Sequence, residues 1–325
     1  MTVFGKQVRD AASSVVPTAC HVVIVMAIRD GRSCLPQQLE SIRAQSHRDW
    51  SLIASDDGSS DGSDDIVANF ASRIAENAVL RLQGPCRGYA ENFLSILRRL
   101  PKDQFWIAFS DQDDVWKPDR LERGILALRN LPENVPALYC GRTWITDHDL
   151  KPLRLSAARP RPPSFRNALV QNIAAGNTIL LNPAASRLVR DAAHEAGEVI
   201  AHDWWTYQLV TGAGGTVVHD DEPTVLYRQH EANQIGANDD FRARLRRVHM
   251  ILSGEYRRWN DVNCAALNAS AHRLTAEHRS ILADFDAIRS ASLFRRLNGV
   301  ARLGLYRQSR LSTAAIWVSA ILRRL

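Results

Sequence analysis

Three aspartates crowd into four positions of the sequence, immediately after a strongly apolar stretch. Asp111, Asp113 and Asp114 follow a run of Phe, Trp, Ile, Ala and Phe at residues 105–109, which predicts a buried strand. Side chains two positions apart on an extended chain point the same way, so Asp111 and Asp113 can converge on one cation. Carboxylate oxygens suit Mg²⁺ or Mn²⁺, and crowded carboxylates repel one another unless a cation is present. A metal site therefore accounts for them better than the alternative, an acidic turn that caps the next helix.

A second acidic cluster, Asp-Asp-Gly-Ser-Ser-Asp-Gly-Ser at residues 56–63, follows a predicted strand at residues 50–55. Asp-Gly and Ser-Asp-Gly-Ser are ordinary sequences of turns and helix N-caps. A carboxylate at a strand end can also accept hydrogen bonds from the imide N–H of uracil or thymine and from ribose hydroxyls. Taken alone, this cluster predicts a turn.

The elements that carry these residues alternate between strand and helix. Strands are predicted at residues 21–28, 50–55, 79–83 and 104–110, and helices at 33–45, around Ile66, Phe70 and Ile74, and around Phe93, Leu97 and Leu100. This alternation implies an α/β fold with a parallel sheet and right-handed crossovers. In such a sheet ligands gather at the carboxyl ends of the strands, where both acidic clusters lie. A third acid, Asp203, opens a helix predicted at 203–211.

The second half of the chain is less regular. Residues 153–163 are rich in Arg and Pro and predict a loop, whereas 174–182 and 216–230 predict strands. Beyond residue 241 the pattern becomes helical and arginine-rich. We therefore expect an N-terminal extension at 1–20, an α/β domain at 21–240 and a basic helical region at 241–325.

Composition limits the class of protein. The 325-residue chain is 45% hydrophobic and 23% charged, as in globular rather than disordered or fibrous proteins. Its five cysteines are odd in number and lack C-x-x-C spacing, which disfavours a disulfide framework or a structural zinc site and suits a reducing cytosol. No signal peptide is expected, and the late apolar run at 314–322 is too short to span a bilayer.

Charge is distributed unevenly along the chain. Residues 241–325 contain 16 arginines, no lysine and five acids, a net charge of +11 against +6 for the whole chain. Arginines on a segment that also carries Ile316, Trp317, Ile321 and Leu322 are typical of a helix at an anionic lipid surface. A helical hairpin packed on the α/β domain is the alternative, and no nucleic-acid reader motif accompanies the charge. We expect a cytoplasmic protein that is peripheral on the inner face of the cytoplasmic membrane.

The order of these motifs resembles the family-2 glycosyltransferases, inverting enzymes of the GT-A fold, over about residues 21–235. The resemblance rests on the apolar strand at 22–28, Ser-Asp-Asp-Gly-Ser-Ser-Asp at 55–61, Gly88 and Asn92, Phe-Ser-Asp-Gln-Asp-Asp at 109–114, and His-Asp-Trp-Trp at 202–205. Tyr-Arg-Gln-His at 227–230, followed by Asn233, resembles the rhamnosyltransferase-like subgroup of bacterial surface-polysaccharide assembly. The implied fold is a Rossmann-like, mostly parallel sheet flanked by helices, with a helical C-terminal appendage.

The resemblance also implies a role for each matching position. These roles are donor binding for Asp56, Asp57, Asn92 and Arg228, metal binding for Asp111, Asp113 and His230, and acceptor contacts for Asp114, Trp204 and Trp205. Asp203 matches the general base that deprotonates the acceptor hydroxyl. The alternatives are a diphosphate contact or a surface histidine for His230, a helix cap for Asp114, and core packing for the tryptophans. An inverting transfer is a single displacement, which needs one base and positive charge on the departing diphosphate but no protein nucleophile.

We therefore expect an inverting glycosyltransferase that uses Mn²⁺ or Mg²⁺ and a nucleotide-diphosphate sugar, with dTDP-rhamnose as the first candidate. The acceptor is expected to be a glycan or a lipid-linked glycan, and no nucleic-acid partner is expected. Two alternatives stay open, a metal-dependent nucleotidyltransferase and a non-catalytic glycan-binding module, because both also place carboxylates or sugar-binding groups on such a sheet.

Overall fold

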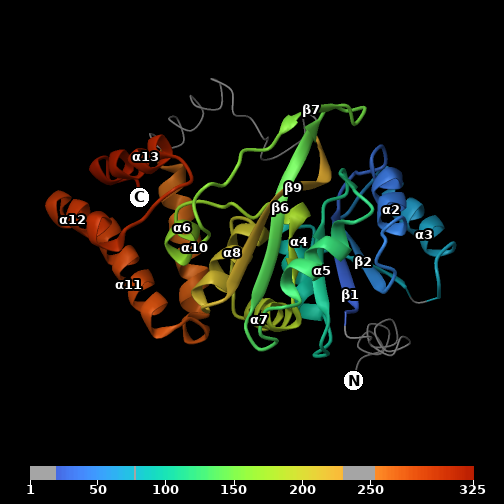
Figure 1. Ribbon diagram of the computed structural model, residues 1–325, viewed down its shortest axis with the longest axis horizontal. Coiled ribbons are helices and arrows are strands. Elements are labelled where there is room, and N and C mark those ends of the chain that lie inside the picture. The colour runs from blue at the N-terminus through green and yellow to red at the C-terminus, as the bar shows by residue number, and fades with distance from the viewer. Residues whose placement is uncertain (1–19, 77, 230–252) are drawn as a thin grey trace.

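A mixed sheet, with helices on both faces, organises the protein (Figure 1). The structure is a computed structural model that describes residues 20–76, 78–229 and 253–325. Within these residues the strands follow the order β3-β2-β1-β4-β8-β6-β9-β5, and β7 pairs with β6 outside this path.

The first four strands are parallel and alternate with helices, as the sequence predicts. They are β1 (Val22–Ile28), β2 (Trp50–Asp56), β3 (Val79–Gln83) and β4 (Trp106–Ser110), and the helices between them are α2 (Leu35–Arg43), α3 (Ser63–Ala71) and α4 (Tyr89–Arg99). Because β1 pairs in parallel with both β2 and β4, the carboxyl ends of the three strands meet at one edge of the sheet. The two acidic clusters follow β2 and β4, so they start on either side of the loop after β1.

The second half surrounds one long pair of strands. Its elements are β5 (Val115–Trp116), α5 (Arg120–Leu128), β6 (Ala137–Thr146), β7 (Pro152–Leu155), α6 (Phe165–Ala168), the 3-10 helix η1 (Gly176–Thr178), β8 (Leu180–Leu181), α7 (Pro183–Ala193), α8 (His202–Gly212) and β9 (Thr216–Arg228). β6 pairs in parallel with β9, and β8 is antiparallel to both β4 and β6. The sheet is therefore mixed on this side.

Two predictions for this half are wrong, and one strand was not predicted. The strand expected at 174–182 is confined to β8, because residues 176–178 turn into η1 and leave the sheet. The loop expected at 153–163 begins inside β7. β6 has no counterpart in the predictions: its residues alternate poorly, and its register against β9 shifts between Gly141 and Thr143.

The sheet separates two hydrophobic layers, and β1 shows why. Val22, Ile24 and Met26 pack on the face covered by α2, α3 and α5, whereas Val23 and Val25 pack on the face covered by α4, α7 and α8. Neighbouring residues of a strand point to opposite faces, so a strand covered on both sides must be apolar throughout. This burial on both faces produces the uninterrupted apolar run from which the strand was predicted.

Four α-helices lie in the described residues 253–325. They are α10 (Glu255–Ala269), α11 (Ala276–Ser290), α12 (Leu293–Leu303) and α13 (Arg310–Ile321), with the short 3-10 helix η2 (Ala271–Arg273) after α10. Figure 1 shows them at the end of the molecule remote from α2 and α3. Leu267, Phe285 and Val300 belong to the same hydrophobic core as α4 and α8. The predicted boundary near residue 240, residues 1–19 of the predicted extension at 1–20, and His230 lie outside the described residues.

The expected helical region is thus present from residue 255, and its helices pack on the α/β part through their apolar residues. No helix among the described residues is long and apolar enough to cross a membrane. All five cysteines are described, and none forms a disulfide.

Candidate active site

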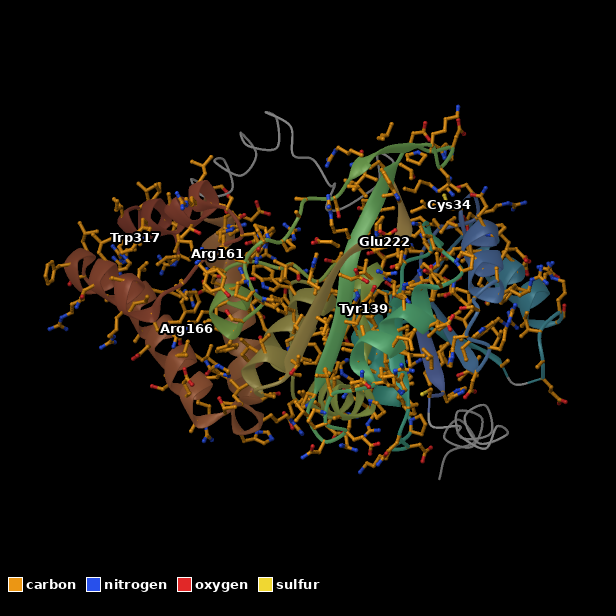
Figure 2. The ribbon with its side chains drawn as sticks, in the orientation of Figure 1. Cys34, Tyr139, Arg161, Arg166, Glu222 and Trp317 are labelled. Atoms are coloured by element: carbon orange, nitrogen blue, oxygen red, sulfur yellow. The ribbon has the colours of Figure 1, made fainter. Side chains whose placement is uncertain are left out.

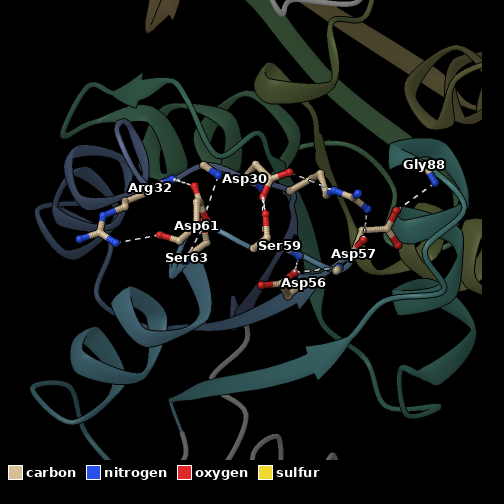
Figure 3. Close-up of polar contacts among 12 residues, drawn as sticks. Asp30, Arg32, Asp56, Asp57, Ser59, Asp61, Ser63 and Gly88 are labelled. Atoms are coloured by element: carbon tan, nitrogen blue, oxygen red, sulfur yellow. Dashed lines mark hydrogen bonds and ion pairs between the residues drawn. The ribbon is translucent and has the colours of Figure 1, made fainter.

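The loops after β1 and β2 are joined by hydrogen bonds between backbone groups and short polar side chains (Figure 3). The hydroxyl of Ser59 accepts from the backbone N–H of Asp30 at 2.9 Å. The carboxylate of Asp61 accepts from the backbone N–H of Arg32 at 2.8 Å. Asp61 also accepts from the N–H of Ser63, at the start of α3, at 3.0 Å. These residues therefore have the turn and capping contacts that their types predict, and they fix the loop at the end of β2.

Asp56 and Asp57 are adjacent but use their carboxylates differently. Asp56 accepts from two backbone N–H groups of its own turn, at 2.9 and 2.7 Å. Asp57 is only 3% exposed and reaches the loop after β3, where it accepts from the N–H groups of Cys86 at 2.6 Å and Gly88 at 2.9 Å. Asp57 thus sets the shape of the edge at which the nucleotide was expected.

Asn92 lies behind Asp57 and is fully buried. Its amide donates to the backbone carbonyl of Ser55 at 2.9 Å, and its Oδ1 accepts from the Ser55 hydroxyl at 2.6 Å. A Cβ on Gly84 would lie 2.7 Å from Oδ1 of Asp57 and 2.8 Å from Oδ1 of Asn92. Asn92 therefore ties α4 to β2, with its polar atoms directed at the protein, and it adjoins Gly84 as Asp57 does.

The acidic loop after β4 is fastened to the β1 loop by Gln112. The Gln112 side chain accepts from the backbone N–H of Arg29 and donates to the Arg29 carbonyl, both at 2.8 Å. Asp111 and Asp113, on either side of Gln112, are partly exposed. Burial, and then the nearby carboxylates of Asp113 and Asp203, raise the pKa of Asp111 to about 8. The fold has therefore brought Asp203 within electrostatic range of Asp111, although the two were predicted from separate motifs.

Asp114 lies beneath this loop and is fully buried. Its carboxylate accepts from the side-chain amide of Asn177 at 2.5 Å and from the backbone N–H of Arg228 at 3.4 Å. Burial, then the Asp113 and Asp111 carboxylates, raise the pKa of Asp114 well above its usual value. This position makes Asp114 a link between the acidic loop, η1 and the end of β9, out of reach of an acceptor in this conformation.

Arg228 has a comparable position. Its guanidinium is 3% exposed and donates to the backbone carbonyl of Asp113 at 3.0 Å, to the carbonyl of His148 and to the side chain of Gln37. These contacts join the acidic loop to the turn after β6 and to α2. Arg228 therefore positions Asp113 from inside the protein, whereas the predicted donor contact would require an exposed guanidinium.

Arg120 is a residue that sequence reasoning missed. It is 1% exposed at the start of α5, and its guanidinium donates to the backbone carbonyls of Phe109 at 3.0 Å and Asn177 at 2.8 Å. The guanidinium carbon lies 3.5 Å from the centre of the Trp116 ring. Burial lowers the pKa of Arg120 to about 9, while the Asp114 and Asp111 carboxylates act in the opposite direction. A positive charge is thus buried directly below the acidic loop.

Asp203 lies in the first turn of α8, facing η1. Its carboxylate accepts from the backbone N–H of Trp204 at 2.7 Å and from that of Gly176 at 3.1 Å. Burial raises the pKa of Asp203 to about 6, and the hydrogen bonds from these N–H groups oppose the rise. A carboxylate with a pKa near neutrality suits a general base, because it is ionised at neutral pH and still takes up a proton readily.

The neighbours of Asp203 on α8 are buried. His202 stacks on Phe93 with ring centroids 3.7 Å apart, and its two ring nitrogens have no hydrogen-bond partner among the described residues. Burial lowers the pKa of His202 to about 3, so the ring is neutral. Trp204 donates to the carbonyl of Ala168 at 2.7 Å, and Trp205 is fully buried. Both tryptophans pack in the protein interior, which leaves no Trp205 ring face for a sugar.

Two tyrosines complete the surroundings of the acids. Burial raises the pKa of Tyr227, and four nearby carboxylates add to the rise, those of Asp114, Asp111, Asp113 and Asp203. Burial also raises the pKa of Tyr89, with contributions from Asp203 and Asp111. Tyr227 belongs to the Tyr-Arg-Gln-His motif, and Tyr89 follows Gly88 at the start of α4. Their positions in or next to these motif residues were the only sequence signal that could have found them.

The donor set fits a hard divalent cation. Asp111 and Asp113 offer carboxylate oxygens, and the mutual repulsion that raises the Asp111 pKa would be relieved by a cation. Among the described residues no three His, Cys, Asp or Glu side chains converge as a metal site. Mg²⁺ is commonly held by one or two carboxylates together with substrate phosphates, so two protein ligands are sufficient. The third predicted ligand, His230, is outside the described residues.

The comparison with known families defines the class. Residues 22–182 match the model of the family described as "Glycosyl transferase family 2", which spans β1 to the end of β8 and includes both acidic clusters. The chain therefore carries a family-2 glycosyltransferase domain, and the expected α/β fold and family are confirmed. The match favours glycosyl transfer over the nucleotidyltransferase and the glycan-binding module.

Relatives cover more of the chain. The protein is 26% identical over 247 residues to the "dTDP-rhamnosyl transferase RfbG" of Shigella flexneri, which covers 72% of this chain and 81% of the relative. It is also 31% identical over 107 residues to the "Putative glycosyltransferase EpsE" of Bacillus subtilis. This match covers 33% of this chain and 38% of the relative. The first of these relatives extends the similarity beyond the family domain.

Solved structures show the same architecture. The crystal structure of S. aureus TarS 1–349 superposes with a TM-score of 0.54 at 14% identity, covering 94% of this chain and 80% of that chain. The complex of TarS 1–349 with UDP-GlcNAc superposes with a TM-score of 0.53 at 15% identity, covering 92% and 79%. At these identities the comparison establishes the fold alone.

Proposed function

We propose that this glycosyltransferase is a divalent-metal-dependent, inverting enzyme that transfers a sugar from a nucleotide-diphosphate donor to a hydroxyl of a glycan or lipid-linked acceptor. The observation that carries the proposal is that η1 connects Asp203 to the acidic loop: Gly176 donates to Asp203, and the adjacent Asn177 donates to Asp114. The raised pKa of Asp203 agrees with this arrangement. A base near the metal-binding carboxylates is the arrangement that a single displacement requires, because acceptor oxygen and departing diphosphate lie on opposite sides of the transferred carbon.

Each chain residue has a defined task in this proposal. Asp57 holds the loop after β3 and, with Asp56, forms the edge that receives the base and ribose. Asp203 removes the proton from the acceptor hydroxyl as its oxygen attacks the anomeric carbon, and the bond to the diphosphate oxygen breaks. Asp111 and Asp113 would hold Mn²⁺ or Mg²⁺, which neutralises charge on the departing diphosphate when bound.

The named relatives support the donor and the acceptor that we propose. The relative named for dTDP-rhamnosyl transfer supports rhamnose as the first candidate sugar and thymidine diphosphate as the first candidate nucleotide. A "Putative teichuronic acid biosynthesis glycosyltransferase" of Bacillus subtilis, 28% identical over 102 residues, supports a role in cell-surface polysaccharide assembly. We infer that the enzyme carries out this role in the cytoplasm, at the inner face of the cytoplasmic membrane.

Asp203→Asn tests the proposed base. Asn retains the shape and can still accept hydrogen bonds from the N–H groups of Trp204 and Gly176, but it takes up no proton at neutral pH. We expect transfer to slow at least about a hundredfold with near-normal donor affinity, as for loss of a general base. Asn also caps helices as well as Asp, so unchanged turnover in this variant would remove Asp203 from the mechanism.

Asp113→Asn is the matched variant for the metal. It should weaken Mn²⁺-dependent donor binding and transfer together, because a lost ligand affects the metal and the diphosphate bound to it. Donor affinity can be measured by thermal shift with dTDP-rhamnose and other nucleotide-sugars, with and without Mn²⁺, since a ligand at about 100 times its dissociation constant adds about 2.7 kcal/mol of stability. Full activity of Asp113→Asn in excess chelator would contradict metal dependence.

A further inference from the structure

Large hydrophobic side chains are exposed mainly at one end of the protein. Nine are exposed among the described residues, and seven of these lie between positions 293 and 322. The seven are Leu293, Phe294, Leu311, Trp317, Val318, Ile321 and Leu322. The two others, Leu126 and Leu153, stand singly on α5 and β7. Scattered single residues are normal on a protein surface, whereas a concentration of this kind indicates an interaction site.

α13 accounts for most of these residues, and they share one face. Leu311, Val318 and Ile321 are spaced by seven and three positions, which places them along one side of the helix. The opposite side is buried: Ile316 and Ala320 belong to the core that includes α4 and α8. We call the exposed side, formed by Leu311, Ala314, Trp317, Val318, Ile321 and Leu322, the apolar face of α13. Figure 2 shows Trp317 on this helix, at the end of the molecule opposite Cys34.

The segment that carries this face has charged side chains of one sign. Residues 291–325 contain seven arginines and no lysine, aspartate or glutamate. Arg295, Arg302, Arg310 and Arg323 are exposed. Arg302 lies 3.3 Å from Asp284 of α11, an ion pair between exposed side chains that leaves the overall excess of positive charge in place.

We propose that the apolar face of α13 and the arginines around it dock this enzyme on an anionic lipid surface. A helix that presents Trp, Leu, Val and Ile on one side among arginines lies in the plane of the lipid headgroups, with its apolar side chains at the acyl boundary. Each arginine near anionic headgroups adds to the attraction. Since no described helix is long enough to span a bilayer, the contact is peripheral.

A second copy of the chain fits this face poorly. A two-fold interface places the same surface against itself, so the arginines of one copy would face those of the other with no acid between 291 and 325 to pair with them. Nucleic acid would satisfy the charge. However, the face is mainly aliphatic, and single-stranded nucleic acids are bound through aromatic side chains that stack on bases. Anionic lipid satisfies both the charge and the aliphatic surface.

α13 is fixed to the α/β part, so docking would orient the whole enzyme. The hydroxyl of Thr313 donates to the carbonyl of Arg307, and the Arg161 guanidinium lies 4.0 Å from the Tyr306 ring centre. The Tyr306 hydroxyl is 2.7 Å from that of Ser164, at the start of α6. These contacts connect the segment before α13 to the loop that follows β7. A helix attached in this way transmits its orientation at the membrane to the active site.

The experiment is flotation of the full chain with vesicles, in the absence of donor and acceptor. Vesicles of phosphatidylglycerol and phosphatidylcholine are compared with vesicles of phosphatidylcholine alone. We expect binding to the anionic vesicles that weakens steeply as salt is raised, since exposed charges are screened. Because neither substrate is present, failure here leaves the proposed glycosyl transfer untouched, and loss of transfer leaves this proposal untouched.

Two pairs of matched variants locate the contact. Leu311→Ser with Val318→Ser removes apolar side chains from the face, and Leu126→Ser with Leu153→Ser removes the two exposed apolar side chains elsewhere. Arg295→Glu with Arg310→Glu reverses two charges near the face, and Arg129→Glu with Arg187→Glu reverses two exposed arginines outside it. Each variant at the face should lower the partition coefficient at least about tenfold, and each control should change it less than about twofold.

Three results would overturn the proposal. Equal binding to neutral and anionic vesicles would contradict electrostatic attraction to the lipid. An equal loss of vesicle binding in the face variants and the control variants would show that the contact lies elsewhere. Absence of vesicle binding, together with a dimer that the Leu311→Ser and Val318→Ser substitutions dissociate, would assign the face to a second copy. Circular dichroism of each variant establishes that the fold is intact, which is expected because every substituted side chain is exposed.

Discussion

The backbone N–H of Gly176 donates to the carboxylate of Asp203 at 3.1 Å, across the gap between η1 and α8. The same glycine faces His202: a Cβ at position 176 would lie 2.9 Å from Nε2 of His202 and 3.4 Å from Cβ of Asp203. The absence of a side chain therefore lets η1 approach α8 closely enough for the hydrogen bond. The orientation of the proposed base depends on this contact.

Gly176→Ala should slow transfer without loss of donor binding. The added methyl group must displace His202 or η1, and misplacement of a catalytic group by about 1 Å costs up to about a hundredfold in rate. We expect kcat to fall at least about tenfold while donor affinity, measured by thermal shift, stays near normal. Gly197→Ala is the control, because a Cβ at that exposed glycine meets nothing within 4 Å. Equal kinetics for the two variants would contradict the role given to Gly176.

Gly84→Ala should act on the donor instead. A Cβ there would lie 2.7 Å from Oδ1 of Asp57 and 3.0 Å from the backbone carbonyl of Asp56, closer than such contacts permit. The loop after β3 or Asp57 must then move, and we expect donor affinity to fall about tenfold, equivalent to about 1.4 kcal/mol. The dissociation constant of the nucleotide-sugar measures this effect. Unchanged donor affinity in a folded Gly84→Ala protein would separate Asp57 from the nucleotide site.

The first half of the fold could be predicted from sequence because burial there leaves a simple pattern. β1 and β4 are covered on both faces and are therefore apolar throughout, and the acids follow directly where the strands end. β6 is mostly buried, but Gly141, Arg142 and Thr143 interrupt its apolar residues and its register shifts, so it shows neither a long apolar run nor clean alternation.

The supporting groups of the site are less visible in the sequence. Arg120 and Arg228 are buried, although arginine is usually exposed, and nothing local marks them as internal. Their partners are mainly backbone carbonyls, which every residue has, so no complementary side chain reveals the contact. Asp111, Asp113 and Asp203 could be predicted because carboxylates at strand and helix ends suggest chemistry, whereas the burial of Asp114 depends on Asn177, 63 positions away.

Arg120→Lys should destabilise the fold. Arginine donates to carbonyls of Phe109, Asn177 and Ile179 and lies over the Trp116 ring, whereas lysine has fewer donors and no planar group to stack. Buried carbonyls left without a donor cost about 1–3 kcal/mol, and we expect a total loss of about 3 kcal/mol. Urea unfolding measures it. Arg129→Lys, at an exposed site at the end of the same helix, should change stability by less than about 0.5 kcal/mol.

The raised pKa of Asp203 predicts how its removal changes the dependence of stability on pH. Burial raises this pKa from an ordinary value of 3.8 to about 6, so between these values the folded protein holds a proton that the unfolded chain has released. The contribution of Asp203 to the stability of the wild-type protein therefore falls as pH rises from about 4 to about 6, because ionisation of the carboxyl is harder in the folded state.

Asp203→Asn has no such proton and should escape this loss. The unfolding free energy of the variant minus that of the wild type should increase by up to about 3 kcal/mol between pH 4 and pH 7, given about 1.36 kcal/mol for each pKa unit. The hydrogen bonds from Gly176 and Trp204 affect the difference in unfolding free energy by a similar amount at both pH values. The change of that difference with pH therefore reports the ionisation of Asp203. Urea unfolding of both proteins in chelator gives the measurement. A difference that stays constant across this range would show that Asp203 ionises at its ordinary pKa, and a base with that pKa would be far weaker than the one proposed.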